Sequence, residues 1–597
     1  MSCLFNSYDP YFKQPFGAVR AGQTVHLTLC IPEELGYVDP HLVLQKEGKY
    51  DVPVHYRMRF DGQTPHQNHF SVDVVLGDPG LYFYYFDLYT DFRRIVRGAD
   101  NCGVVSWQEG ESWQITVYEP EFQTPECIKG KVFYQIFPDR FCEGIENKPM
   151  PFPDRLYQAD KHAEPFWQPN ETGGHLNEDY FGGDLEGIRI KLPYLREMGV
   201  DYLYLNPIFE AHSNHRYNTA DYLNVDPLLG TNEEFEVLCR EAAKYGIGIV
   251  LDGVFSHTGS DSRYFNREGR YGEGGAYRDP NSPYRSWYDF DPKYKGGYRS
   301  WWGFETLPEV NEETPSFVEF ITGEGGVIDT WLRRGAAGFR LDVADELPDE
   351  FIEKIRTAVK RVSPEKFLLG KGLDSVMNYP FKNSVLDFVK GKPAQQAANE
   401  ILSICEHYPA PAINTALNFL STHDTERALT VIADEPANGR GREWQSGRSV
   451  TGEAYEEGML RLRMAYAIIY TLPGVPCLYY GDEIGMQGYR DPFNRAFFCW
   501  DSHEERLRPV LAQLAQLRHS CEAFRTGELR VLRAEDGILH YQRIGKTETA
   551  EIIVNRSEHI IVEPLASGKH TEVNPMGFTI VVEENGHNPN HSYYDIQ

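Results

Sequence analysis

Two hydrophobic patterns divide the chain. Up to about residue 125, apolar and aromatic residues alternate with polar ones or gather in short runs separated by Gly, Pro, Asn and Asp. This pattern is typical of β-strands, and no helical period of useful length interrupts it. It predicts an N-terminal β-sandwich over residues 1–125, with strands at 24–31, 69–77, 80–89 and 112–120.

From about residue 131 onwards, short apolar runs alternate with amphipathic helical stretches such as 185–199 and 232–246. The runs that predict strands are 132–137, 202–207, 247–254, 338–343, 367–370, 374–379, 416–424 and 475–483. Eight strands that alternate with helices indicate an α/β fold. The specific prediction is a (β/α)8 TIM barrel built from residues 126–257 and 311–527.

Two more segments complete the predicted organisation. Residues 258–310 form a connection rich in Gly, Tyr, Arg and Asp, which is too long for a plain loop and predicts an inserted domain. The insertion follows the C-terminal end of the third barrel strand, which is the end where barrel active sites lie. A helix at 504–523 closes the barrel, and residues 528–597 predict a small C-terminal β-domain.

Composition indicates which binding partners and which cellular compartment to expect. The chain has 59 Lys and Arg against 88 Asp and Glu, so its formal charge of -29 repels phosphate backbones and no nucleic-acid partner is expected. No apolar stretch is long enough to span a membrane, and the N-terminus lacks a signal-peptide pattern. None of the ten Cys forms a C-x-x-C pair, so no zinc site or disulfide framework is indicated. These features predict a cytoplasmic protein with reduced thiols.

Polar residues gather at the ends of four predicted barrel strands. Arg340 and Asp342 are two residues apart on one strand, so both side chains face the same side, and the arginine is expected to keep the carboxylate ionised. The other three clusters contribute Tyr217, Asp252 with His257, and His423 with Asp424. Each cluster alone also fits a structural role such as an ion pair. Together, at successive strand ends, they predict one pocket.

Several motifs carry a resemblance to a known family. They are YQIFPDRF (134–141), FGGDL (181–185), LDGVFSH (251–257), GFRLDV (338–343) and LPGVPCLYYGDE (472–483). In this order they resemble the α-amylase family of retaining α-glycosidases, glycoside hydrolase family 13. The β-domain ahead of the barrel, LPEVN (307–311) and MNYPF (377–381) are most similar to the neopullulanase, cyclomaltodextrinase and maltogenic amylase branch.

The resemblance implies roles for individual residues. Asp342 is implied as the nucleophile that forms a covalent glycosyl-enzyme, and Asp424 as the carboxylate that binds sugar hydroxyls and stabilises the transition state. Substrate-binding roles around the same sugar ring are implied for Arg340, His257, His423, Tyr217 and Asp252. Retaining glycosidases also need a second carboxylate, which acts as acid and base across the bond being cleaved.

That second carboxylate is the point of departure from the family. The family has a Glu at the end of the fifth strand, whereas this chain reads KFLLGKGLDSVMNYPF (366–381) and has Lys371 there. Only three residues separate Gly370 from Asp374, too few for the crossover between parallel strands. Glu365 and Asp374 both precede strands, so they are expected at the opposite face of the barrel. A whole βα unit is therefore absent.

Three explanations fit this departure. The sequence lacks a segment that the natural protein has, the chain carries a deletion, or the protein is a naturally inactive relative. The first two are favoured, because loss of a crossover helix exposes core and costs several kcal/mol. The remainder of the site is intact, which suits a protein built to be active.

The resulting expectation is an α-glucan hydrolase that cleaves α-1,4 bonds of maltodextrins, cyclodextrins or pullulan by double displacement, with transglycosylation as a side reaction. The alternative is a catalytically impaired glucan-binding relative. The expected partners are α-glucan oligosaccharides and a second copy of the chain, whose N-terminal β-domain covers the active site. No cofactor is required, and calcium is not favoured, because Ile145 and Lys148 are poor ligands although Gly182 and Asp184 remain.

Overall fold

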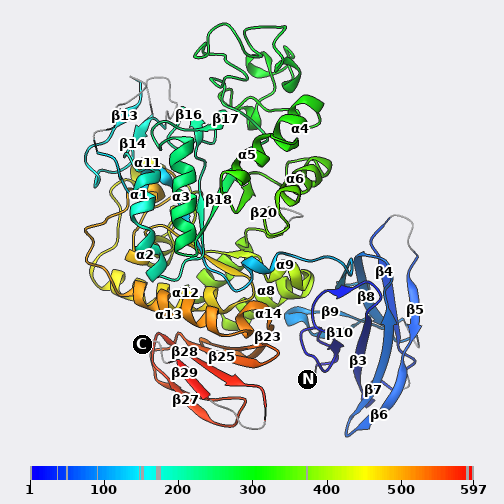
Figure 1. The fold of residues 1–597 in the computed structure, drawn as a ribbon. Coiled ribbons are helices and arrows are strands. Elements are labelled where there is room, and N and C mark those ends of the chain that lie inside the picture. Colours follow the sequence, from blue (N-terminus) through cyan, green and yellow to red (C-terminus); the bar gives the residue numbers. More distant parts are fainter. Residues whose placement is uncertain are drawn as a thin grey trace.

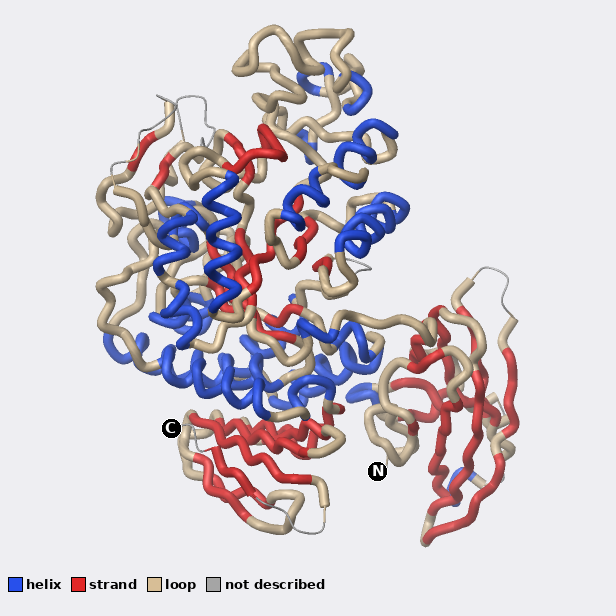
Figure 2. Tube along the Cα trace, viewed as in Figure 1, coloured by secondary structure: helices blue, strands red, loops and turns tan. Residues whose placement is uncertain are grey.

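A computed structural model describes residues 3–36, 38–48, 52–89, 92–146, 148, 154–169, 177–370, 374–586 and 591–594. Helices gather around a central parallel sheet, and mostly β-structure lies at the two ends of the chain (Figure 1). Figure 2 shows the contrast between the helix-rich centre and these two strand-rich parts. The insertion after the third barrel strand lies far from both of them.

The N-terminal part consists of two sheets around one core. One sheet has the order β1-β3-β7-β6, and the other has the order β10-β9-β8-β11-β2, with β4 and β5 added at β8. The bounds are β1 Lys13–Gln14, β2 Val19–Arg20, β3 Thr24–Pro32, β4 His41–Lys46, β5 Val54–Arg57, β6 Arg59–Thr64, β7 Gln67–Val75, β8 Gly80–Asp87, β9 Arg94–Arg97, β10 Gly103–Ser106 and β11 Trp113–Tyr118. Phe5, Tyr84 and Trp113 pack between the sheets, as alternation of buried and exposed positions requires.

Seven parallel strands form the central sheet in the order β20-β19-β18-β15-β12-β22-β21. Their bounds are β12 Phe133–Ile136, β15 Tyr202–Leu205, β18 Gly248–Gly253, β19 Gly338–Leu341, β20 Phe367–Leu369, β21 Leu417–Asn418 and β22 Val475–Tyr479. Each of the seven lies within a run that the sequence predicts as a strand. Strands such as β12, β19 and β22 are buried throughout, which explains why their residues are mainly apolar, with Gln135 and Arg340 as exceptions that belong to the candidate site.

The predicted sixth strand, 374–379, is reduced to two isolated bridges. Ser375 pairs in parallel with Leu369 of β20, and Met377 pairs in parallel with Leu417 of β21. These bridges connect the two outer strands of the sheet, which is the connection that a closed barrel needs. In the described chain no helix lies between β20 and Ser375, where residues 371–373, including Lys371, fall outside the description.

Helices cover the sheet at the other connections. Their bounds are α1 Leu185–Ile190, α2 Leu192–Glu197, α3 Asn232–Lys244, α4 Pro315–Thr322, α5 Val327–Arg333, α6 Asp349–Val362, α7 Tyr379–Lys390, α8 Ala394–His407, α9 Ala410–Ile413, α10 Ala428–Ala433, α11 Arg442–Gln445, α12 Gly452–Thr471, α13 Leu507–Ser520 and α14 Ala523–Thr526. Thr231 and Glu234 form a capping box that starts α3. The predicted helix 185–199 is divided into α1 and α2 at Lys191.

The loops at the carboxyl ends of the strands carry little regular structure. Two short strands, β16 Phe209–Ala211 and β17 Thr219–Val225, pair after β15, and β13 Leu156–Tyr157 pairs with β14 Asp179–Tyr180. In the insertion, buried aromatic rings replace strand pairing: Phe265 packs on Tyr288 and Tyr298 with ring centres 4.8 and 4.6 Å apart. This packing explains the aromatic-rich composition of the segment.

The C-terminal part is a five-stranded antiparallel sheet with the order β23-β24-β25-β28-β29, beside the pair β26 and β27. The bounds are β23 Glu528–Glu535, β24 Ile538–Ile544, β25 Glu548–Asn555, β26 Ile561–Pro564, β27 His570–Val573, β28 Gly577–Glu584 and β29 His591–Tyr594. The buried Arg543 on β24 donates from Nη1 to the carbonyl of Thr471 at 2.7 Å, which ties the sheet to the end of α12.

The N-terminal sheets are tied to α8 by a buried ion pair. Lys13 Nζ lies 2.9 Å from Glu406 Oε1, and Ser7 donates to the other oxygen of the same carboxylate. Figure 1 shows these sheets beside the helix-rich centre and away from the insertion. The homodimer, in which the N-terminal β-domain of one chain covers the active site of its partner, stays a prediction. None of the helices in the described chain is both long and apolar enough to cross a membrane.

Asp374 links the segment after β20 to α6, at the edge of the sheet where the crossover helix is absent. Its carboxylate is buried and lies 3.0 Å from Lys360 Nζ and 3.5 Å from Arg356 Nη2, both on α6, and it accepts the N–H of Leu368 at 3.1 Å. We predict that Asp374→Ala lowers the free energy of unfolding by about 2 kcal/mol, because it leaves a buried N–H and two cations without their acceptor. Chemical denaturation of the full chain measures this loss.

Glu365→Gln is the matched control, because Glu365 is exposed and lies only nine positions away. Its expected change is within about 0.5 kcal/mol. Equal stability of the Asp374 variant and the control would show that the ion pairs with α6 do not hold this edge.

Candidate active site

One arginine shared by two carboxylates forms the centre of the candidate site. Arg340 on β19 and Asp252 on β18 are register partners on neighbouring strands, which brings their side chains together. Arg340 Nη1 donates to Asp252 Oδ1 at 2.9 Å and to Asp342 Oδ1 at 2.8 Å. The structure thus places the three charged residues from two strand ends in one ion-paired group.

A hydrogen-bond chain extends from this group across the pocket. The Tyr217 hydroxyl donates to Asp252 Oδ2 at 2.7 Å and lies 2.7 Å from His423 Nε2. Gln135 on β12 donates its amide to His423 Nδ1 at 2.9 Å, so the ring proton is on Nε2, facing Tyr217. Burial lowers the pKa of His423 to about 4, so its ring is neutral at pH 7. Tyr204 donates a further hydrogen bond to Asp252 at 2.8 Å.

The rings of Tyr217 and His423 stack on each other, with centres 5.3 Å apart and planes 11° apart. Asn206 also donates to the Tyr217 hydroxyl at 2.9 Å, so that this oxygen has all its hydrogen-bond partners within the network. The predicted contact of Tyr217 with a sugar ring stays a prediction. The hydroxyl of Tyr217 itself serves to orient Asp252 and His423.

Asp424 is the exposed carboxylate of the group. Its side chain is 50 % exposed, against 15 % for Asp342. Asp424 Oδ2 lies 3.2 Å from His423 Nε2, and its Oδ1 lies 3.7 Å from Arg495 Nη2. Burial acts to raise the pKa of Asp424, but His423 and Arg495 outweigh it and hold the pKa below its usual range. Asp424 is therefore an ionised carboxylate with free access to a ligand.

The pKa of Asp342 moves in the opposite direction. Burial raises it to about 7, although Arg340 acts to lower it. The Arg340 pair alone predicts a lowered pKa, and this prediction is wrong because the arginine is shared with Asp252 and the Asp342 side chain is itself largely buried. Asp342 and Asp424 thus have unlike acidities, which is a common feature of paired carboxylates in active sites.

His257 follows β18 and is buried, with a pKa that burial lowers to about 4. The Ser256 hydroxyl lies 2.9 Å from His257 Nδ1, while Nε2 has no hydrogen-bond partner among the described residues. An unpaired buried nitrogen indicates a position for a ligand group. The ring of Trp301 in the insertion stacks on His257 with centres 5.3 Å apart.

The indoles of Trp301 and Trp302 belong to the site, although the sequence analysis did not single them out. Both donate to Glu346, at 2.9 and 3.0 Å, and Glu346 lies four residues after Asp342. The two rings stack with centres 5.3 Å apart, and the Trp302 side chain is 76 % exposed. Exposed aromatic rings of this kind suit the apolar faces of sugars. The two adjacent tryptophans in the predicted insertion were the feature of the sequence that could have indicated this aromatic surface.

The backbone is strained where these residues are held. Val343, directly after Asp342, has φ 42°, and Trp302 has φ 49°. A left-handed backbone is rare for a bulky or β-branched residue and costs about 1–3 kcal/mol. Strain of this size is found where the surrounding structure fixes a functional side chain in place.

The end of β20 has no acidic residue to complete the site. Residues 370–373 are Gly, Lys, Gly and Leu, and only Gly370 of them is described. Asp374 is bound to α6 on the outside of the sheet, and Glu365 is exposed before β20. Tyr379, at the start of α7, lies close enough to Asp424 and Asp342 for their charges to act, after burial, to raise its pKa. A phenol with a raised pKa is a poor general acid at pH 7.

A lysine occupies the place considered for calcium. Lys148 Nζ donates to the carbonyls of Gly182 and Leu228 at 3.0 and 3.1 Å and forms an ion pair with Asp184. Asp184 also accepts the N–H groups of Gly144 and Ile145, each at 3.0 Å. The ammonium group thus takes the carbonyl and carboxylate oxygens that a calcium ion needs, so this set of residues does not fit the ion.

The α-amylase catalytic domain pattern matches this chain in two stretches, residues 135–366 and 357–518. The two stretches overlap at residues 357–366, from the end of α6 to the residue before β20. An amylopullulanase of Thermoanaerobacter thermohydrosulfuricus is 33 % identical over 609 residues, covering 90 % of this chain and 40 % of the relative. The chain thus spans less than half the length of that relative. A cyclomaltodextrinase of Geobacillus thermopakistaniensis is 31 % identical over 468 residues, covering 74 % of this chain and 72 % of the relative.

Two further relatives agree with these matches. Neopullulanase 2 of Thermoactinomyces vulgaris is 33 % identical over 437 residues, covering 69 % of this chain and 67 % of the relative. Among solved structures, a cyclic α-maltosyl-(1→6)-maltose hydrolase from Arthrobacter globiformis superimposes with a TM-score of 0.65 at 28 % identity, covering 77 % of this chain and 100 % of that one. The chain belongs to the α-amylase family, in the branch of the cyclomaltodextrinases, maltogenic amylases and neopullulanases.

Proposed function

We propose that this chain is a retaining α-glucan hydrolase on a (β/α)8 barrel and that, as it stands, only the nucleophilic half of its site is present. The observation that carries the proposal is that Arg340 holds Asp342 at 2.8 Å, whereas residues 370–373 at the end of β20 include no acidic residue. The names of the relatives, among them cyclomaltodextrinase and neopullulanase, support α-glucan oligosaccharides as substrates.

The proposed first step is glycosylation of the enzyme. Asp342 attacks the anomeric carbon with its free oxygen, while Arg340 holds the other oxygen. The bond from that carbon to the glycosidic oxygen breaks, and the leaving sugar must gain a proton. In the second step a water molecule loses a proton, attacks the same carbon and releases Asp342. Both proton transfers need the carboxylate that the chain lacks.

The other side chains of the site bind and orient the sugar. Asp424 is exposed and ionised, so it accepts hydrogen bonds from hydroxyl groups of the sugar ring that is attacked. His257 offers its unpaired Nε2 to a hydroxyl at the same subsite. Trp301 and Trp302, fixed by Glu346, provide an aromatic surface for the part of the glucan beyond the cleaved bond. Asp252 and Tyr217 position these groups through the shared arginine and His423.

The second candidate function is glucan binding without turnover. The absence of an acidic residue at 370–373 favours it, because the binding groups are present without the proton donor. We further propose that no calcium is needed at Asp184, since the ammonium of Lys148 occupies its oxygen ligands. The homodimer and the cytoplasmic location stay predictions.

The leaving group separates the two candidates. Fluoride departs from α-maltosyl fluoride without a proton, whereas the sugar leaving from maltotriose requires one. We predict that the chain releases about one equivalent of fluoride in a rapid burst, because glycosylation by this substrate needs no proton donor but hydrolysis of the glycosyl-enzyme needs the absent base. Maltotriose should be cleaved at least about a hundredfold more slowly than by a relative with the complete site, since a positioned acid contributes about 10² to 10⁴ in rate. Burst kinetics of fluoride release and steady-state kinetics with maltotriose measure these two quantities. Maltotriose turnover at an ordinary enzymatic rate would contradict the missing acid, and failure to release fluoride would favour glucan binding alone.

Asp342→Asn tests the nucleophile and the pKa shift together. We predict that it lowers fluoride release at least about a thousandfold, because an amide cannot form the glycosyl-enzyme. Stability changes in the other direction. The folded-state pKa of Asp342 is about 7, above its unfolded value, so the wild type loses stability as the pH rises towards 7. The wild type loses at most about 3 kcal/mol of unfolding free energy in this way between pH 5 and pH 8, and the variant, which has no carboxyl group there, does not.

Thermal melts at pH 5 and pH 8 test the stability prediction. The melting temperature of the variant relative to that of the wild type should be higher at pH 8 than at pH 5. Asp345→Asn is the matched control, because Asp345 is exposed and lies three residues further along the same segment. It should leave fluoride release and the pH dependence of the melting temperature unchanged. Fluoride release by Asp342→Asn within threefold of the wild type would reject Asp342 as the nucleophile.

A further inference from the structure

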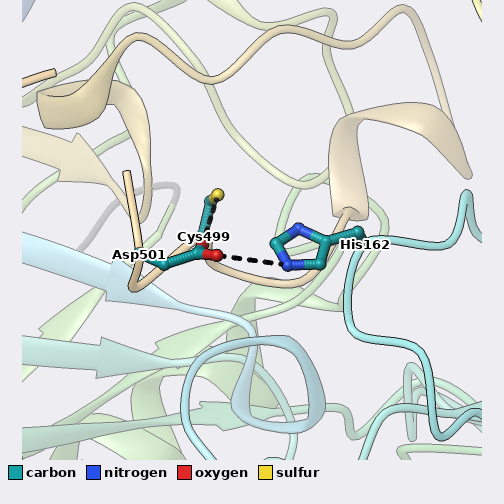
Figure 3. Close-up of side chains that lie close together, drawn as sticks. All are labelled: His162, Cys499 and Asp501. Atoms are coloured by element: carbon teal, nitrogen blue, oxygen red, sulfur yellow. Dashed lines mark hydrogen bonds and ion pairs between the residues drawn. The ribbon is translucent and has the colours of Figure 1, made fainter. Parts of the chain in front are cut away.

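Three side chains of different chemistry meet at the rim of the central domain. His162 comes from the segment that follows β13, and Cys499 and Asp501 follow β22 far along the chain (Figure 3). Their nitrogen, sulfur and oxygen atoms all lie within 4.8 Å of one another. Cys499 Sγ lies 3.1 Å from Asp501 Oδ1, and His162 Nε2 lies 3.4 Å from Asp501 Oδ2.

These distances suit a tetrahedral metal ion. Zinc binds imidazole, thiolate and carboxylate at about 2.0–2.3 Å, so that tetrahedral ligand atoms lie roughly 3.3–3.8 Å apart. The two contacts with Asp501 use its two different oxygens, at 3.1 and 3.4 Å, and one ligand atom from each of the three residues lies within 4.8 Å of the others. Side-chain rotations of about an ångström bring these three atoms into the tetrahedral range. Magnesium and calcium prefer sets of oxygen ligands, so a ligand set of N, S and O selects a softer ion such as zinc.

The segment of His162 is fixed on both sides of the histidine. Lys161 Nζ lies 2.9 Å from Glu143 Oε2 and stands over the ring of Phe497. Glu164 accepts hydrogen bonds from the Ser446 hydroxyl at 2.6 Å and from the N–H of Gly447 at 2.8 Å. His162 therefore faces the other two side chains from a backbone that is already in position, which lowers the entropy cost of binding an ion.

The segment of Cys499 and Asp501 is fixed as well. The indole of Trp500, between them, donates to the carbonyl of Phe141 at 2.7 Å, and its ring lies under Lys191 Nζ at 3.6 Å. Because Trp500 is anchored to the domain, its two neighbours are held on the rim beside His162. Two distant segments thus present three metal-binding groups on supported backbones, with the side chains of His162 and Asp501 open to solvent and to an incoming ion.

We propose that His162, Cys499 and Asp501 bind one zinc ion, with water completing the coordination. The ion joins the segment 154–169 to the segment after β22, which also carries Arg495 beside Asp424. It is a structural clip at the rim of the site and takes no part in the glycosidic chemistry. Its coordination replaces the hydrogen bond between Cys499 and Asp501 and releases the proton of the thiol.

Titration of the purified full chain with Zn²⁺ and with Co²⁺ tests this site. The expected result is one equivalent of Zn²⁺ bound, a higher melting temperature in its presence, and a thiolate-to-metal charge-transfer band in the near-ultraviolet spectrum of the Co²⁺ form. Cys499→Ser should remove the band, and His162→Ala and Asp501→Asn should each weaken Zn²⁺ binding at least tenfold. None of these residues belongs to the proposed catalytic group, so fluoride release should remain.

Two controls make the outcome specific. Cys127→Ser removes another partly exposed thiol at a different place and should leave both titrations unchanged. Asp342→Asn removes a carboxylate of the active site and should also leave the Co²⁺ band unchanged. Zinc binding that persists undiminished in Cys499→Ser and His162→Ala, or a Co²⁺ form without the band in the wild type, would overturn the proposal. A band lost in Cys127→Ser would place the metal elsewhere.

Discussion

The candidate site depends on one arginine that two carboxylates share. Arg340 lies between Asp252 and Asp342 on neighbouring strands, and its charge balances only part of theirs. Burial then raises the pKa of Asp342 to about 7, whereas His423 and Arg495 outweigh burial at Asp424 and hold its pKa below the usual range. Tyr217 and His423 extend the same group by hydrogen bonds, which fixes its geometry without substrate.

The absent crossover explains why this group stands without an acid partner. A complete βα unit at the end of β20 would place a loop beside Asp342, but the chain passes directly to Ser375. Asp374, the first carboxylate after β20, is turned to α6 and compensates two cations there. The two stretches that match the family pattern overlap at residues 357–366, just before the same place. The fold and the family pattern thus place the departure at the same point of the chain.

Much of this architecture could be predicted from the sequence, because it follows from local patterns. Buried parallel strands are mainly apolar, so β12 and β18 begin and end within two residues of the predicted bounds. β22 begins at the predicted residue but ends at Tyr479 instead of residue 483. The Arg340 and Asp342 pair followed from the period of a strand. The direction of the Asp342 pKa shift did not, since it depends on Asp252 from another strand and on burial.

Other features required the three-dimensional arrangement. His162 lies near Cys499 and Asp501 although no spacing rule connects the two segments, so the sequence, which has no C-x-x-C pair, gave no indication of this cluster. The contact of Trp301 and Trp302 with Glu346 likewise links the insertion to the end of β19. The shortening of the predicted sixth strand to two bridges follows from the absent helix, which the number of residues between Gly370 and Asp374 had indicated.

In the proposed function, Asp342 forms the glycosyl-enzyme while no carboxylate assists its release. The most direct test is the mass of the intact chain after incubation with α-maltosyl fluoride, followed by peptide mapping. The account predicts an added maltosyl unit on the peptide that contains Asp342, because hydrolysis of the intermediate needs a base. Azide, which attacks without losing a proton, should remove the unit as maltosyl azide. A chain that stays unmodified would contradict the account, whether it hydrolyses maltotriose at an ordinary rate or leaves both substrates intact.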